Sequence, residues 1–184
     1  MQGVYLNQTT AANTVMSAGG MVTLKSNQTV QLVKAHIASP TAQAFNIVLN
    51  SDLDGNSSGR IALTTSNLLS SGGNITLGGG ADPLTGNAFG VAGAVEGINL
   101  NASTLNAAGG TISLRGRGYA GTTNNYGILM QAAAKAQTSG TGTVTLTGTS
   151  GAGTNVNYAL YLTGAGTAVS SVDGAINLTG TAQG

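Results

Sequence analysis

Short phrases in which apolar and polar residues alternate recur along the chain, and most begin with Gly and close with Leu. Their pattern is Gly-x-apolar-x-Leu, and the copies are GMVTL (20–24), GRIAL (59–63), GTISL (110–114), GTVTL (142–146), GAINL (174–178) and the near-copy GNITL (73–77). A second phrase lies between them, as GVYL (3–6), GINL (97–100), GILM (127–130) and ALYL (159–162). Because side chains alternate across a strand, this period of two predicts a β-strand with one apolar face at every phrase.

The phrases are evenly spaced in the second half of the chain. From Leu114 onward the closing apolar residue recurs every sixteen residues, and because the two phrases alternate, the structural repeat is thirty-two residues. A fixed period of this length is typical of a solenoid, in which each repeat buries its apolar face against its neighbours. Linkers such as 116–125 and 148–157 are too short and too rich in Gly for crossover helices, so we expect the chain to coil, turning at its glycines. The predicted fold is all-β, a parallel β-helix (β-solenoid) of about five to six coils.

Each phrase also predicts which residues face the interior. In 142–146, Val144 and Leu146 share the inner face, and the same alternation places Tyr5, Leu129 and Tyr161 outside. The other inward pairs are Val4/Leu6, Val22/Leu24, Ile61/Leu63, Ile75/Leu77, Ile98/Leu100, Ile112/Leu114, Ile128/Met130, Leu160/Leu162 and Ile176/Leu178. A weaker third strand around Leu105 and Val169–Val172 predicts three faces in each coil.

The first half of the chain is less regular. Leu49, Leu63 and Leu77 lie fourteen residues apart, and 29–38 adds apolar residues without the phrase. We therefore expect one β-helix segment over 1–184, a fragment of a longer repeat protein, with irregular insertions near 29–44 and 80–96. The stretch MQAAAKAQ (130–137) is the best candidate for a helix, but it is barely two turns long and its place in the repeat favours a strand.

Composition agrees with a patterned β-protein. Charged residues are 6% of the chain, against about a quarter in ordinary domains. Apolar residues are 41% and the net charge is +1, which is not the signature of disorder. The nearly neutral charge, without a basic cluster, argues against nucleic acid, and no apolar run approaches the ~18 residues that span a membrane. The chain has no Cys, so disulfides and thiolate metal sites are excluded.

Two sequence motifs match catalytic or cofactor patterns only by composition. GNSSG (55–59) fits a nucleophile pattern and GRGYAG (116–121) fits a dinucleotide-binding pattern, but neither is followed by a predicted helix. The single histidine, His36, lies upstream of both and cannot form a metal site alone. We therefore expect no cofactor.

The carboxylates are few and scattered. Asp52 and Asp54 could bind calcium with nearby carbonyls, and the alternative is a turn with solvated carboxylates, because a bidentate Glu is missing. The remaining three, Asp82, Glu96 and Asp173, are spread along the chain. A β-helical glycosidase or lyase needs several acids on one face, so we do not expect an enzyme.

Exposed aromatic residues are the main candidates for ligand contact. Tyr5, Tyr119 and Tyr161 would serve as stacking platforms if the chain were a carbohydrate-binding module. Tyr126 and Tyr158 are thirty-two residues apart, so we expect them to stack on each other. The outward Thr rows in 143–147 and 179–181 suggest an ice-binding solenoid as a further alternative, although Ser113 and Asn177 interrupt the rows.

Most of the chain resembles a known family of bacterial surface proteins. The runs NIVLNSDLDGNSSGRIALTTSNLLSSGGNITLGGGADPLTGNAFG (46–90) and GINLNASTLNAAGGTISLRGRG (97–118) are similar to the passenger domains of filamentous-haemagglutinin-type large exoproteins. The resemblance implies a right-handed β-helix, secreted or displayed at the bacterial cell surface, that acts as an adhesive stalk or filament. Its implied partner is a host or neighbouring-cell surface, protein or glycan. Because the open end of a solenoid exposes unpaired strands, we also expect end-to-end self-association or continuation of the parent chain.

Overall fold

The computed structural model describes residues 3–7, 14–17 and 20–183. Within these residues the regular elements are all β-strands, arranged in three sheets of parallel neighbours. The same residues include no helix of the length and apolarity needed to cross a membrane.

The strands alternate among the three sheets in sequence order. Sheet A consists of β1 (Gly3–Asn7), β4 (Thr29–Val33), β7 (Ile61–Thr64), β11 (Ile98–Asn101), β14 (Ile128–Gln131) and β17 (Leu160–Leu162). Sheet B consists of β2 (Thr14–Ser17), β5 (Ala35–Ala38), β8 (Asn67–Leu69), β12 (Thr104–Asn106), β15 (Lys135–Gln137) and β18 (Ala168–Ser170). Sheet C consists of β3 (Met21–Lys25), β6 (Asn46–Ser51), β9 (Ile75–Gly79), β13 (Ile112–Arg117), β16 (Val144–Thr149) and β19 (Ile176–Thr181), and the short β10 (Ala88–Phe89) also pairs with β13.

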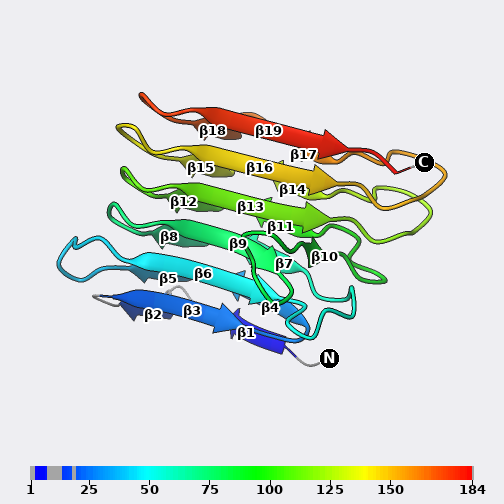
Figure 1. Cartoon of the computed structure of the whole chain (residues 1–184), viewed down its shortest axis with the longest axis horizontal. Coiled ribbons are helices and arrows are strands. Elements are labelled where there is room, and N and C mark those ends of the chain that lie inside the picture. Colours follow the sequence, from blue (N-terminus) through cyan, green and yellow to red (C-terminus); the bar gives the residue numbers. More distant parts are fainter. Residues whose placement is uncertain (1–2, 8–13, 18–19, 184) are drawn as a thin grey trace.

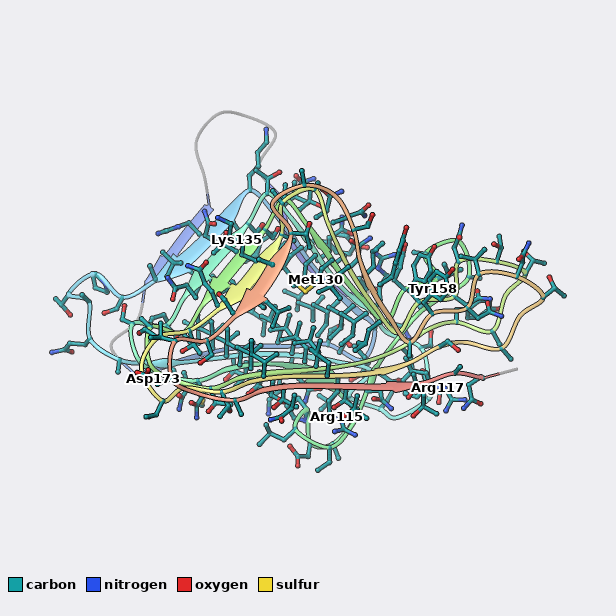
Figure 2. The ribbon with its side chains drawn as sticks, turned by 90° about the horizontal axis from the view of Figure 1, so that it is seen from above. Arg115, Arg117, Met130, Lys135, Tyr158 and Asp173 are labelled. Carbon is teal, nitrogen blue, oxygen red and sulfur yellow. The ribbon has the colours of Figure 1, made fainter. Side chains whose placement is uncertain are left out.

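Three consecutive strands, one in each sheet, form what we call a layer, and the described residues build six layers. Figure 1 shows the layers stacked in sequence order, from β1, β2 and β3 in blue to β17, β18 and β19 in red. Figure 2 looks along the stack and shows the sheets around a common interior, with Met130 between them and Arg115 outside. The expected all-β architecture with three faces is therefore confirmed, and the six layers are consistent with a β-helix.

Columns of apolar side chains fill the interior from layer to layer. In sheet C the register pairs Leu49 with Leu77, Leu77 with Leu114 and Leu114 with Leu146, and all four side chains are fully buried. Each of these Leu side chains is covered by a neighbouring layer on both sides. Leu178 in the last layer pairs with Leu146 on one side only and is 51% exposed. The predicted inward positions of the middle layers are confirmed by their burial.

Two predictions for the first half of the chain are wrong. GRIAL (59–63), grouped by its spelling with the strands of sheet C, supplies β7 of sheet A, where Ile61 pairs with Ile98. The insertion expected near 29–44 is not irregular over 29–38, which form β4 and β5 in register with β1 and β2. These strands keep the apolar alternation but lack the leading Gly. The stretch 130–137 forms β14, a turn and β15, as its place in the repeat predicts.

The expectation that the chain turns at its glycines holds for some corners only: Gly72, Gly109 and Gly140 hold left-handed backbone where sheet B passes to sheet C, but other corners turn without glycine. Where sheet A passes to sheet B, left-handed backbone occurs at Lys34 (φ 52°), Thr65 (φ 50°), Ala102 (φ 49°) and Ala132 (φ 55°). The phrase glycines serve instead for close approach: a Cβ added at Gly110 would collide with the carbonyl oxygen of Gly73 in the adjacent layer. Glycine here allows the layers to stack.

The insertion expected near 80–96 lies on the outside of the stack. Residues 80–97 connect sheet C to sheet A and are longer than the equivalent connections 118–127 and 150–159. Residues 81–84 line a hollow on the outer face of sheet C, and Val91 and Ala94 line one on sheet A. This segment therefore shapes the outer surface of two sheets.

Candidate functional site

A row of outward side chains crosses the middle of sheet A, one from each layer. The register pairs Tyr5 with Gln31, Gln31 with Ala62, and Ala62 with Asn99. It continues through Leu129 to Tyr161. We call these six residues the sheet A row. It brings two of the predicted ligand-facing tyrosines, Tyr5 and Tyr161, onto one line along the stack.

The lower part of this row forms the floor of a groove with a volume of about 290 Å³. Tyr5, Gln31, Ala62 and Asn99 contribute to it, together with Asn101 from the neighbouring outward position of β11. Val91 and Ala94 form its wall, and they are held to each other by paired backbone hydrogen bonds of 3.0 and 2.9 Å. The groove therefore depends on the insertion at 80–96 being held against sheet A.

One ion pair connects the wall to the sheet. Arg60 Nη1 lies 2.9 Å from Glu96 Oε2, and the two side chains are 12% and 17% exposed. Burial lowers the pKa of Arg60, while the charge and hydrogen bond of Glu96 oppose that shift. This is the only ion pair found among the described residues. Because Glu96 balances Arg60, the charged residue that lines the groove is already neutralised.

Amide side chains provide the open hydrogen-bonding groups of the groove. Gln131 Nε2 donates to Asn99 Oδ1 over a long 3.4 Å, which leaves the Asn99 amide nitrogen available. Within the described part of the chain, the side chains of Gln31 and Asn101 form no hydrogen bond with protein, and both are partly exposed. An amide offers donors and acceptors together, so the floor can bind a ligand that carries both.

Three tyrosines gather at the upper end of the sheet A row. The rings of Tyr126 and Tyr158 are stacked, with centroids 6.0 Å apart and planes 11° apart, which confirms their predicted stacking. Tyr161 is tilted against both, at 5.0 Å from Tyr126 and 5.4 Å from Tyr158. Burial and the neighbouring tyrosines raise the pKa of Tyr126, whose hydroxyl donates to Asn124. Figure 2 shows Tyr158 on the loops that project beyond the sheets.

Leu129 and Tyr119 do not add to the exposed part of the sheet A row. Leu129 does take an outward position beside Tyr161, but it is only 5% exposed. Tyr119 is 39% exposed and lies off the sheet A row, in a separate hollow of about 280 Å³ with Phe89 and Arg117. The Arg117 guanidinium carbon lies 5.7 Å from the centre of the Phe89 ring. The three tyrosines predicted as platforms therefore do not form one surface.

Asp52 and Asp54 lie in a turn, but Asp52 is not solvated. It is 1% exposed, its Oδ1 accepts the N–H of Ser58 at 3.1 Å, and burial raises its pKa. Asp54 Oδ2 accepts a hydrogen bond from Asn56 Nδ2 at 2.8 Å. In the described ranges, no three acidic, His or Cys side chains lie close enough together to hold a metal ion. One carboxylate oxygen of each residue is thus engaged within the loop after β6.

The remaining motif residues lie on separate surfaces. GNSSG (55–59) is in the connection after β6, and GRGYAG (116–121) runs from the end of β13 into a loop. His36 lies on sheet B, paired in register with Asn67. Thr145 lies between Ser113 and Asn177 on sheet C, so the Thr row is broken there as the sequence indicates.

The groove residues Gln31, Arg60 and Asn99 were not singled out from the sequence. Asn99 has the same outward position in 97–100 as Tyr5 has in 3–6 and Tyr161 has in 159–162. That shared position is the feature of the sequence from which Asn99 could have been selected. Gln31 lacks that signal because its strand does not begin with Gly.

No protein-family model matches the chain, and no curated protein or solved structure matches it either.

Proposed function

We propose that the chain is a segment of a right-handed parallel β-helix that serves as a rigid stalk in a bacterial fibrous adhesin. In this proposal the protein is secreted or held at the cell surface, is not an enzyme, and contacts a host or neighbouring-cell surface. The supporting observation is the stacking of six parallel strands in each of three sheets. In such a stack, hydrogen bonds run along one axis, and each middle layer is held by neighbours on two sides.

Exposed apolar residues at one end of the stack support lengthwise assembly. Leu162, Ile176 and Leu178, which occupy inward positions of the last layer, are 37%, 44% and 51% exposed. Their strands β17 and β19 each have one hydrogen-bonded neighbour among the described residues. A further layer placed on them would bury these side chains and pair the open strand edges. In the proposal, a second copy of the chain or continuing polypeptide supplies that layer.

Association of the purified protein tests this proposal. We expect sedimentation velocity to show species that grow with protein concentration, and electron microscopy to show filaments of constant width. Leu178→Lys places a charge at the end of the stack and should suppress both, whereas Lys135→Ala on the outer face of sheet B should suppress neither. A protein that stays monomeric and monodisperse at high concentration would contradict the proposed assembly.

A further inference from the structure

We propose that the groove on the outer face of sheet A binds a neutral, linear oligosaccharide that lies along the stacking axis. The juxtaposition that carries the proposal is the line of Tyr5, Gln31 and Asn99, with Ala62 between the two amides, beneath a wall held by an ion pair. The stalk role does not require this site, and the site does not require the stalk.

The chemistry of the floor matches hydroxyl groups. Each sugar hydroxyl both donates and accepts, and the amides of Gln31, Asn99 and Asn101 offer both functions on one surface. The groove holds about 290 Å³, which is at the lower end of the range of ordinary ligand sites. A purely apolar ligand would leave these amides without partners and is disfavoured.

Aromatic rings lie at both ends of the row. Tyr5, at one end, is 42% exposed, and Tyr161, at the other, belongs to the tyrosine cluster. At about 4.8 Å for each layer, the row from Tyr5 to Tyr161 is about 24 Å long. A Tyr ring presents an apolar face and a polar hydroxyl, as a sugar ring does. A saccharide that extends along the groove from Tyr5 to Asn99 therefore fits better than a compact one, while Leu129, 5% exposed, separates the groove from Tyr161.

Charge favours a neutral ligand over an acidic one. The guanidinium of Arg60 is already bound to Glu96 at 2.9 Å, and both side chains are mostly buried. An anionic saccharide would therefore have to break this pair or bind beside Glu96, which costs free energy. The other groove residues named above are uncharged.

The test uses cellohexaose and maltohexaose as neutral probes, with a heparin hexasaccharide as the charged comparison, each titrated into the full chain by calorimetry. Asn99→Ala removes a floor amide, and Gln31→Ala is the second variant. The matched control is Asn177→Ala, since Asn177 is also an outward mid-strand Asn but lies on sheet C. Far-UV circular dichroism and urea unfolding establish that each variant retains the fold.

We expect a neutral hexasaccharide to bind, and each floor variant to weaken it about five- to tenfold, as expected for one lost hydrogen bond. Asn177→Ala should leave the affinity unchanged. The proposal is overturned if neither neutral probe binds, if Asn177→Ala weakens binding equally, or if only heparin binds with a steep dependence on salt. Filament formation is measured separately, so a failed groove and a failed stalk give different results.

Discussion

The leucine column of sheet C offers the same substitution at two depths of the stack. Leu114 is fully buried between Leu77 and Leu146, whereas Leu178, in the last layer, is 51% exposed and packs against Leu146. We compare Leu114→Ala with Leu178→Ala because the residue, the strand position and the change are the same. The two sites differ in whether a further layer covers them.

The expected costs follow from burial. Leu→Ala removes three carbon atoms, worth about 0.8 kcal/mol each on transfer from water, or about 2.4 kcal/mol for a fully buried site. A cavity adds to this at Leu114, so the free energy of unfolding should fall by about 3–4 kcal/mol. At Leu178 about half of the transfer free energy is already lost to exposure and no closed cavity forms, so we expect about 1 kcal/mol.

Urea unfolding followed by far-UV circular dichroism, at low protein concentration, measures both values. If the two substitutions cost the same in the dilute protein, the layered account of stability is refuted. Concentration provides a second check on the proposed assembly. When copies stack end to end, Leu178 becomes covered, so the cost of Leu178→Ala should rise with protein concentration while that of Leu114→Ala stays constant.

Three further predictions concern the wall, a buried carboxyl and a strained corner. Arg60→Ala leaves Glu96 partly buried without its partner and should lower the free energy of unfolding by about 1–3 kcal/mol. Glu96→Gln should cost less because the amide oxygen still accepts a hydrogen bond from Arg60, and equal costs for the two variants would contradict this. Because burial raises the pKa of Asp52 above its ordinary value of 3.8, its contribution to stability is largest below pH 3.8 and is lost as the pH rises through the folded-state pKa. Asp52→Asn keeps an acceptor for Ser58 and should remove this dependence in urea titrations across that range; an unchanged pH profile would count against the burial effect. Thr65→Asn replaces a β-branched residue at φ 50° by one that tolerates left-handed backbone, so it should stabilise the fold by about 0.5–1 kcal/mol and raise the melting temperature. A lower melting temperature would refute the strain.

The connections were harder to predict than the strands. The alternation at Val144 and Leu146 correctly indicated an inner face, because a strand places every second residue on the same side. The groove was not predictable in the same way. It requires Arg60 to meet Glu96, 36 residues later, and the length of the connection 80–97 does not specify where its side chains lie.

The corners from sheet A to sheet B were also not predicted, for a local reason. Thr65 and Ala102 hold left-handed backbone although glycine is the residue expected there. At Thr65, the backbone N–H donates to the carbonyl of Asn101 in the next layer, and this contact supports the conformation. A single sequence does not reveal such support, because the partner belongs to another layer.

The sequence by itself determined that this protein is made of strands with one apolar face, that the strands recur at 32 residues in the second half, and that Tyr126 and Tyr158 stack. Only the tertiary structure decided which sheet each strand joins, as for 59–63, and which side chains share the sheet A groove. The physical reason is that a period of two specifies a face but not a partner. Partners are set by the backbone hydrogen bonds between layers and by the course of the loops, which bring residues together across distant parts of the chain.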